Sequence, residues 1–315
     1  GSEMCIRDST ETVLSLYKLY VAFTVAEFFA LRLAGMTWFE ALCHAFSTLG
    51  TGGFSTRNAS VGGFHSPVIE WIVIVFMLIA GISFVQHYRL FVERRARNFI
   101  TDFEVRAFLL GALVAATLVV PTLVLFNGYD LPRAVRGAAF QVSAIITTTG
   151  FGTENFELWY PLAQMILFGL MFIGGCTGST AGGLKVSRFV LLARVVGREF
   201  RRMVERHGVF TVRLGGKVTP ETTIQSLLSL IYVALVVLAA SCLLLAAQGV
   251  DLLTSIAASV ACMFNIGPGF GGVGPAENYA HLPALSKWVL MVCMVAGRLE
   301  FYTLIVLLTP DFWKK

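Results

Sequence analysis

The chain alternates long apolar stretches with short glycine-rich ones, and the same order occurs three times. Each unit has an apolar stretch of membrane-spanning length, a short helix-like run, a glycine loop and a second apolar stretch. The first apolar stretches cover 12–33, 105–126 and 222–247, and the second ones cover 68–91, the segment from 161 and 284–308. The short helices are predicted at 38–49, 131–146 and 252–264. A pattern repeated in this way predicts one architecture used three times.

The three glycine loops, numbered in chain order, cover residues 50–55, 147–153 and 265–272. Superposing Gly52, Gly150 and Gly267 aligns them. Glycine loop 2 reads Thr-Thr-Thr-Gly-Phe-Gly and is similar to the Thr-Val-Gly-Tyr-Gly loop of potassium filters, where backbone carbonyls replace the water shell of the ion. One such run usually means an ordinary loop. Three of them between long apolar segments favour a shared ion-binding role.

Composition places these elements in a membrane. Of the 315 residues, 56% are hydrophobic and only 14% are charged, where soluble domains have about 25% charged residues. The six cysteines form no CxxC pair and indicate small core residues, not a disulfide framework or a metal site. We find no nucleophile–base pair, so an enzyme is the least favoured class.

Positive charge predicts the orientation. Fifteen Lys and Arg residues lie in 93–106, in 185–217 and at the C-terminus, against four at the opposite ends of the spans. This bias predicts cytoplasmic linkers, a cytoplasmic C-terminus, outward-facing glycine loops and three units of the same direction. The basic segment 185–217 suits anionic lipid headgroups, or the docking of a regulatory subunit.

The segment 174–183, called the glycine-rich run below, interrupts an apolar stretch near mid-bilayer, since five of its ten residues are Gly. Irregular backbone at that depth occurs only inside protein or beside water. Arg298 lies near the middle of the last predicted span, where an arginine costs about 2.5–3.5 kcal/mol and usually faces a cavity. The alternative is an ion pair with Glu300 or Glu27.

These motifs together resemble the Trk/Ktr/HKT superfamily of potassium uptake proteins, bacterial TrkH type. The resemblance covers about 11–315. It is carried by Phe-Ser-Thr at 46–48, Thr-Gly-Gly-Phe-Ser at 51–55, glycine loop 2, the glycine-rich run, Asn-Ile-Gly-Pro-Gly at 265–269 and Gly-Arg-Leu-Glu at 297–300. It implies an all-α, polytopic membrane protein, built from pseudo-fourfold units of helix, pore helix, filter loop and helix around a potassium pathway.

The resemblance also implies roles for particular residues. The expected ion-binding filter comprises Thr51, Gly52, Thr148, Thr149, Gly150, Phe151, Asn265, Ile266 and Gly267. The expected gate comprises Gly174, Gly175, Gly178, Ser179, Thr180, Gly182, Gly183 and the pore-facing Arg298. The side chain of Asn265 either points into the pore or caps its own helix.

The resemblance further implies a potassium substrate, a homodimer and a cytoplasmic nucleotide-binding ring of the TrkA type. We expect no covalently bound cofactor, a nucleotide only through that partner, no nucleic-acid binding, and a location in the bacterial inner membrane.

Only three of the four expected units are present. Residues 11–97, 98–217 and 218–315 correspond to the second, third and fourth repeats, and 1–10 read as a non-native leader. The sequence therefore suggests a fragment that lacks the first repeat. A second function fits the broken helices: a cation-coupled secondary carrier with alternating access. Inverted repeats would support a carrier, whereas the charge bias predicts parallel ones.

Overall fold

A computed structural model describes residues 2–205, 208–299, 306 and 310–313, and almost all of its regular structure is helical. Its helices are α1 Ser2–Leu33, α2 Trp38–Leu49, α3 Pro67–Gly81, α4 Phe84–Phe91, α5 Ala96–Thr101, α6 Phe103–Leu125, α7 Leu131–Ile146, α8 Pro161–Leu170, α9 Val186–Val204, α10 Glu221–Ala246, α11 Leu252–Met263, α12 Ala284–Leu299 and α14 Pro310–Trp313. Short 3-10 turns are Ser60–Phe64, Phe156–Leu158, Gly271–Val273 and Tyr279–His281. Strands β1 (Arg213–Leu214) and β2 (Lys217–Val218) form an antiparallel hairpin.

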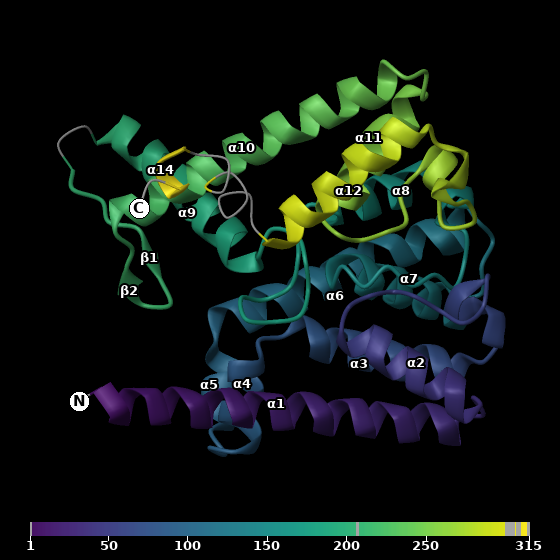
Figure 1. Cartoon of the computed structure of the whole chain (residues 1–315), viewed down its shortest axis with the longest axis horizontal. Helices are drawn as coiled ribbons and strands as arrows, with labels where there is room; N and C mark the ends of the chain where they lie inside the picture. Colours follow the sequence, from purple (N-terminus) through teal and green to yellow (C-terminus); the bar gives the residue numbers. More distant parts are fainter. Residues whose placement is uncertain (1, 206–207, 300–305, 307–309, 314–315) are drawn as a thin grey trace.

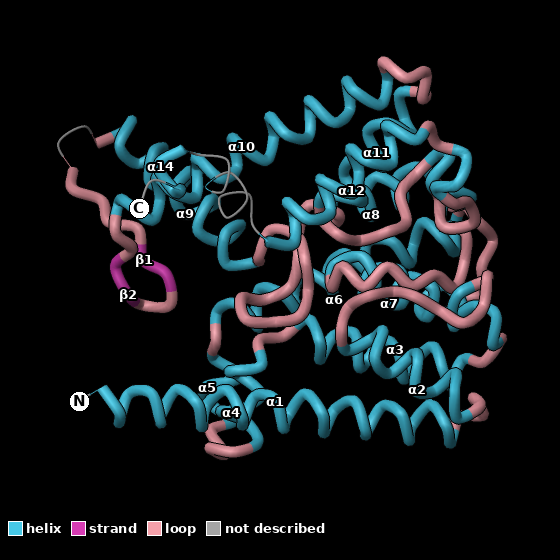
Figure 2. Tube along the Cα trace, in the orientation of Figure 1, coloured by secondary structure: helices cyan, strands magenta, loops and turns pink. Residues whose placement is uncertain are grey.

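Three helices of the described part are long and apolar enough to cross a membrane: Val13–Leu33 within α1, α6 and α10. All three begin at the end of the molecule that also holds α5 and the β hairpin (Figures 1 and 2). They therefore run in the same direction, as the three predicted units require. Residues 2–10 form the first part of α1.

Each of these long helices is followed by one of the short helices α2, α7 and α11, which match the predicted ranges closely. Side-chain caps fix the beginnings of α2 and α11. Thr37 and Glu40 form a capping box at α2, and the Asp251 carboxylate accepts from the Thr254 N–H at 3.0 Å in front of α11. That hydrogen bond holds the pKa of Asp251 below its usual range. Each short helix ends where a glycine loop begins.

The predicted span 68–91 is wrong as a single helix. α3 and α4 meet at an angle of 100°. The backbone groups freed by the break bond to the glycine-rich run, because the Cys176 N–H donates to the Gly81 carbonyl at 2.8 Å and the Phe84 N–H donates to the Gly178 carbonyl at 3.0 Å. These two hydrogen bonds satisfy backbone groups that the break leaves without helical partners.

The interruption predicted after residue 161 is confirmed. α8 ends at Leu170, and the helix resumes only at Val186. Between them Ile173 and Leu184 form a parallel bridge that closes the neck of the glycine-rich run. For the last predicted span, 284–308, α12 covers the first part, while residues 300–305 and 307–309 lie outside the described residues, as does the candidate partner Glu300.

Three buried clusters hold the units together, and the smallest of them joins α9 to α10. The largest lies among α6, α7, α8, α10, α11 and α12 and contains Phe108, Trp159 and Leu245. The second joins α1, α2 and α3 to α7. α7 contributes to both of these, and an ion pair of 2.8 Å between Arg136 and Glu70 also ties it to α3. α7 thus occupies the centre of the arrangement.

The closest helix approach in the third unit gives a test of this packing. A Cβ on Gly297 of α12 would lie 1.7 Å from the Met263 carbonyl oxygen, whereas a Cβ on Gly169 of α8 would meet nothing within 4 Å. We expect Gly297→Ala to push α12 from the end of α11 and to lower stability by about 1–3 kcal/mol. Thermal unfolding of the chain in detergent measures this. Gly169→Ala is the control; equal midpoints for the two variants would contradict the packing.

Candidate functional site

The three glycine loops have the same backbone conformation. Each starts with a residue in the left-handed region and has a left-handed glycine two positions later. The first set is Thr51, Thr148 and Asn265, with φ of 51°, 54° and 57°, and the second is Gly53, Gly150 and Gly267, with φ of 70°, 80° and 101°. The residue between them donates its N–H five residues back in every loop, from Gly52 to Ser47, from Thr149 to Ala144 and from Ile266 to Ala261, at 2.7, 2.9 and 2.9 Å.

This backbone corrects the alignment of glycine loop 1 by one residue. Gly53, and not Gly52, corresponds to Gly150 and Gly267, while Gly52 corresponds to Thr149. Two adjacent glycines hide the register in the sequence, because either one tolerates a positive φ. The phenylalanine after the glycine could have indicated the correct register, because Gly53-Phe54 aligns with Gly150-Phe151.

Successive loops touch through these glycines. A Cβ on Gly53 would lie 1.9 Å from the Thr149 carbonyl oxygen, and a Cβ on Gly150 would lie 1.8 Å from the Ile266 carbonyl oxygen. Each glycine thus packs on the equivalent carbonyl of the next loop. At the corresponding point beside Gly267 there is nothing within 4 Å. The three loops therefore form an arc with one open side.

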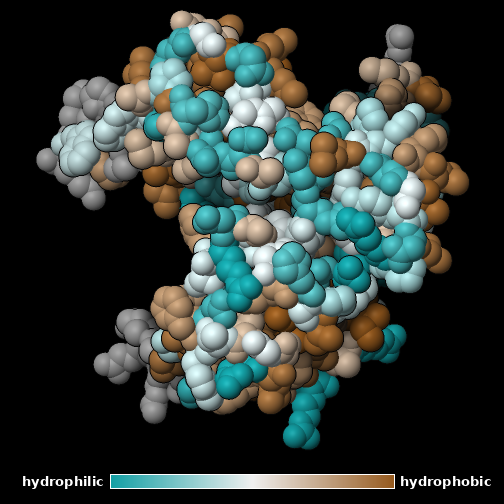
Figure 3. Space-filling view, turned by 90° about the vertical axis from the view of Figure 1, so that its right-hand side faces the viewer, coloured by the Kyte–Doolittle hydropathy of each residue, from teal (hydrophilic) through white to brown (hydrophobic). Residues whose placement is uncertain are grey.

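A cavity of about 550 Å³ lies above the arc, and residues from all three loop regions line it, among them Gly53, Gly150, Glu154 and Pro268. Figure 3 views the molecule from this end and shows polar residues gathered in the middle of the face, with apolar residues toward its edges. The three loops thus share one vestibule.

Bonds at the C-terminal ends of loops 2 and 3 fix the relative positions of the loops. Between the first and second units, the Gly62 N–H donates to the Gly152 carbonyl at 3.1 Å, and the Gly152 N–H donates to Ser60 Oγ at 3.2 Å. Between the second and third, the Gly271 N–H donates to Glu157 Oε1 at 2.5 Å. These contacts hold the arc from its outer side.

His44 of α2 connects the first two loops. Its Nε2 lies 2.9 Å from Ser55 Oγ in loop 1, and its ring stacks on Phe151 of loop 2 at a centroid distance of 5.8 Å. Phe151 is buried, so its side chain supports the loop from behind while only its backbone borders the arc.

The glycine-rich run lies against all three loops. The Thr51 hydroxyl donates to the Thr180 carbonyl at 2.8 Å, and the Gly182 N–H donates to the Thr148 hydroxyl at 2.5 Å. A Cβ on Gly182 would lie 3.1 Å from the Cβ of Asn265. The run therefore contacts the first left-handed residue of every loop, a convergence that the sequence alone did not reveal.

A carboxylate anchors the base of the run. Glu104 Oε1, at the beginning of α6, accepts from the Thr177 N–H at 2.6 Å, from the Thr177 hydroxyl at 2.8 Å and from the Ser187 N–H at 3.3 Å. Lys185 Nζ donates to the Ala181 carbonyl at 2.5 Å. Sequence reasoning missed Glu104, because nothing in its local pattern sets it apart from other first-turn carboxylates.

The remaining predicted residues are placed as follows. Asn265 Nδ2 donates to the Cys262 carbonyl at 3.3 Å and to the Met294 carbonyl at 3.0 Å, so the side chain caps its own helix and binds α12. Gly174 and Gly175 are buried in the neck of the run, and Ser179 donates to the Cys176 carbonyl at 2.6 Å. Arg298 is exposed on α12, next to the contact at Gly297.

The arrangement is suited to a monovalent cation. Three helices point their C-terminal ends at the loops, and each such end carries roughly half a negative charge. Among the described residues no cluster of three or more His, Cys, Asp or Glu gathers as a metal site.

Comparison with known proteins identifies the family. Residues 4–315 match the TrkH family, which is described as a cation transport protein. The chain belongs to the TrkH family. This confirms the resemblance read from the motifs, and the family is a transport family and not an enzyme class.

Individual relatives of the TrkH family agree with this. The chain is 40% identical to the Trk system potassium uptake protein TrkH of Salmonella typhimurium over 308 residues, which covers 97% of the chain and 63% of that relative. It is 39% identical to the protein of the same name from Escherichia coli K12, again over 97% of the chain and 63% of the relative. The crystal structure of the potassium transporter TrkH from Vibrio parahaemolyticus superposes with a TM-score of 0.91 at 37% identity, covering 96% of the chain and 65% of that structure. The chain thus has the all-α fold of that transporter and spans less than two thirds of the length of these relatives.

The corrected register gives the second prediction. Gly53 has a positive φ and no space for a Cβ, whereas a Cβ on Gly52 would meet Ser47 Oγ at an ordinary 3.5 Å. We expect Gly53→Ala to separate loops 1 and 2 and to lower the thermal unfolding midpoint in detergent, with a loss of about 1–3 kcal/mol. Gly52→Ala should change the midpoint little. A larger loss for Gly52→Ala would restore the alignment made from the sequence.

Proposed function

We propose that the chain forms most of a potassium pathway across a membrane, in which backbone carbonyls of the glycine loops replace the water shell of the ion. One observation carries the proposal: three loops with the same order of left-handed residues contact one another in sequence around a single vestibule. Leaving a polar backbone group unpaired at membrane depth costs several kcal/mol. A dehydrated cation beside the loops offsets that cost. The relatives are named as potassium uptake proteins, which favours potassium as the ion.

The proposed filter keeps the residues predicted from the sequence and adds Gly53. It consists of the backbone of Thr51, Gly52, Gly53, Thr148, Thr149, Gly150, Phe151, Asn265, Ile266 and Gly267. The Gly267 carbonyl accepts a hydrogen bond from the Tyr279 hydroxyl at 2.6 Å.

An arc cannot enclose an ion, so the pathway needs a fourth loop on the open side beside Gly267. We assign residues 11–97, 98–217 and 218–315 to the second, third and fourth repeats of a pseudo-fourfold protein. The empty space beside Gly267, where the other two glycines meet a neighbouring carbonyl, supports this assignment.

We assign the glycine-rich run as the gate, because it lies across the inner ends of all three loops. Opening breaks the bond from Thr51 to Thr180 and the bond between Gly182 and Thr148. Each contributes about 0.5–1.5 kcal/mol, which suits a segment that must move during transport. Arg298 completes the gate as a positive charge that slows cations.

The distribution of charge and the relatives together suggest how the protein lies in its membrane. The positive-inside bias supports a cytoplasmic C-terminus and cytoplasmic linkers, and the bacterial relatives support a location in the inner membrane of a bacterium. The basic α9 and β hairpin then face the cytoplasm, where a TrkA-like nucleotide-binding ring docks, and the membrane subunit forms a homodimer.

The alternative is a cation-coupled carrier. Its supporting observation is the pair of broken helices, α3–α4 and α8–α9, that meet at the glycine-rich run. Carriers of this type often use inverted repeats. The common direction of α1, α6 and α10 favours the channel-like pathway (Figure 1).

Selectivity tests the filter. In a version that includes a fourth unit, Gly150→Ser places a side chain where Ile266 lies, which distorts two neighbouring loops. We expect the potassium-over-sodium permeability ratio to fall by on the order of tenfold, equal to a differential of about 1.4 kcal/mol. Uptake in proteoliposomes measures the ratio. Gly152→Ser, at a glycine with open space around its Cβ position, serves as the control; an unchanged ratio for Gly150→Ser would remove the filter assignment.

Basal flux tests the gate. Deleting residues 176–182 removes most of the glycine-rich run, and Glu104→Ala removes the carboxylate that anchors it. We expect each change to raise the potassium leak in the same proteoliposomes. Glu93→Ala removes only a surface ion pair with Arg95 and should leave the leak unaltered. A leak that stays at the basal level in both gate variants would show that the run does not block the pathway.

A further inference from the structure

The Tyr279 hydroxyl lies at the left-handed glycine of loop 3. It donates a hydrogen bond to the Gly267 carbonyl at 2.6 Å, and Gly267 is the residue that corresponds to Gly53 and Gly150 in the other loops. The carbonyl of this glycine is one of the backbone oxygens assigned to the filter above. A side chain from outside the loop therefore holds an oxygen of the filter directly.

The short 3-10 turn Tyr279–His281 gives this hydroxyl a fixed position. Asn278 Oδ1 accepts from the Ala280 N–H at 2.9 Å, and Lys287 Nζ of α12 donates to the Ala280 carbonyl at 2.6 Å. The ring of Tyr279 is partly buried and packs against the largest buried cluster. The turn is thus tied to α12 and to the core, so the hydroxyl is held firmly beside loop 3.

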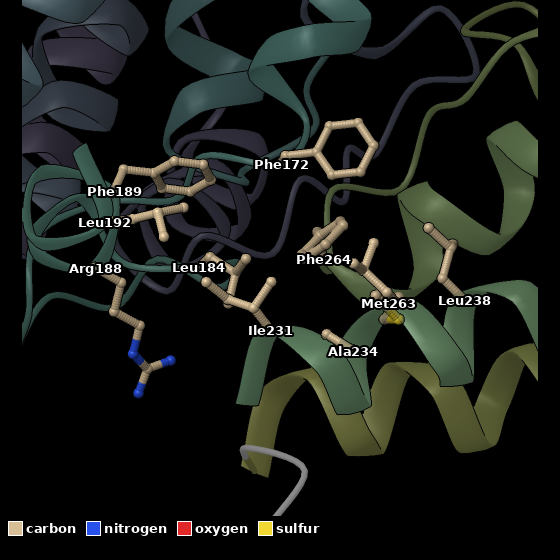
Figure 4. A pocket seen from close by; sticks show the side chains of 11 residues that line it. Phe172, Leu184, Arg188, Phe189, Leu192, Ile231, Ala234, Leu238, Met263 and Phe264 are labelled. Carbon is tan, nitrogen blue, oxygen red and sulfur yellow. The ribbon is translucent and has the colours of Figure 1, made fainter. Parts of the chain in front are cut away.

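Apolar packing leaves room on two sides of loop 3. No atom of the described residues lies within 4 Å of the point where a Cβ on Gly267 would stand. Before the loop, Met263 and Phe264 line an apolar cavity of about 180 Å³, and Figure 4 shows both side chains among those around it. A void offers no contacts to the side chains that border it. Packing alone therefore does not fix the path of this loop.

Hydrogen bonds fix loop 3 where packing does not. Asn265 Nδ2 ties the start of the loop to the Met294 carbonyl of α12 at 3.0 Å. Two residues later, the bond from Tyr279 holds the Gly267 carbonyl. Without that bond, this carbonyl is free to turn or to shift toward an ion of smaller radius.

Small shifts of a carbonyl matter for selectivity. Discrimination between potassium and sodium is ascribed either to the size of the ion cavity or to the number and field strength of the carbonyl dipoles. In both descriptions, moving one oxygen inward changes the preference between the two ions. An oxygen that can follow the smaller ion stabilises sodium more than a fixed oxygen does.

We propose that Tyr279 is a positioning residue for ion selectivity, whose hydroxyl holds the Gly267 carbonyl at the distance that suits potassium. The proposal rests on the proposed function, because it concerns one oxygen of that same filter. Tyr279 lies 12 residues after Gly267, in a polar segment outside the loop, so nothing in the local sequence reveals this role.

The permeability ratio tests the proposal. In a version that includes a fourth unit, Tyr279→Phe removes only the hydroxyl. We expect the potassium-over-sodium ratio in proteoliposomes to fall by roughly threefold to tenfold, as the loss of one hydrogen bond predicts. Tyr160→Phe is the matched control, because it makes the same change on an exposed ring that stacks on Phe126, and it should leave the ratio unchanged.

Gly150→Ser in the same assay separates this proposal from the proposed function. A lowered ratio for Gly150→Ser with an unchanged ratio for Tyr279→Phe overturns the role of Tyr279 and leaves the filter in place. Unchanged ratios in both variants overturn the filter, and the role of Tyr279 with it. An equal fall in Tyr160→Phe would also contradict a specific effect of Tyr279.

Thermal unfolding in two salts distinguishes positioning from a contribution to stability alone. A bound ion raises the unfolding midpoint, so we expect a higher midpoint in potassium chloride than in sodium chloride at equal ionic strength. Tyr279→Phe should narrow this difference, whereas Tyr160→Phe should preserve it. A midpoint that Tyr279→Phe lowers equally in both salts would mean a structural role only and would overturn the proposal.

Discussion

The arrangement depends on one constraint: a polar backbone group that leaves a helix inside a membrane must find another partner. Four segments of the chain leave helical geometry at that depth, namely the three glycine loops and the glycine-rich run. They satisfy much of this need through one another, as in the bonds of Thr51 to Thr180 and of Gly182 to Thr148. The paths of these segments therefore depend on one another.

The same constraint explains why two helices break together. The bend between α3 and α4 exposes the Gly81 carbonyl and the Phe84 N–H, and the glycine-rich run exposes the Cys176 N–H and the Gly178 carbonyl. Each break supplies the partners that the other requires. The bent pair α3–α4 and the glycine-rich run are therefore one structural unit, although they lie far apart in the sequence.

The elements that the sequence predicted correctly are those determined by residues close to them in the chain. Capping residues, periodic apolar positions and glycine density located the short helices, the loops and the interruption after α8, and the common charge bias agreed with the parallel long helices. The bend at residues 82–83 escaped prediction because its cause lies at Cys176 and Gly178. The offset of one residue in loop 1 escaped because two neighbouring glycines are interchangeable by composition and differ only in φ. The anchoring role of Glu104 depends on a contact 73 residues away.

The contact between loops has a direction, since a glycine of one loop always meets a carbonyl of the following loop. In assemblies this is a heterologous, head-to-tail contact, which closes only when the rotation per unit divides the circle. The two ends of the arc are therefore not interchangeable. A segment that completes it has to offer a carbonyl to Gly267 on one flank and a glycine to the Gly52 carbonyl on the other. A loop inserted in the opposite direction would place glycine against glycine and carbonyl against carbonyl, and the ring of loops would not close.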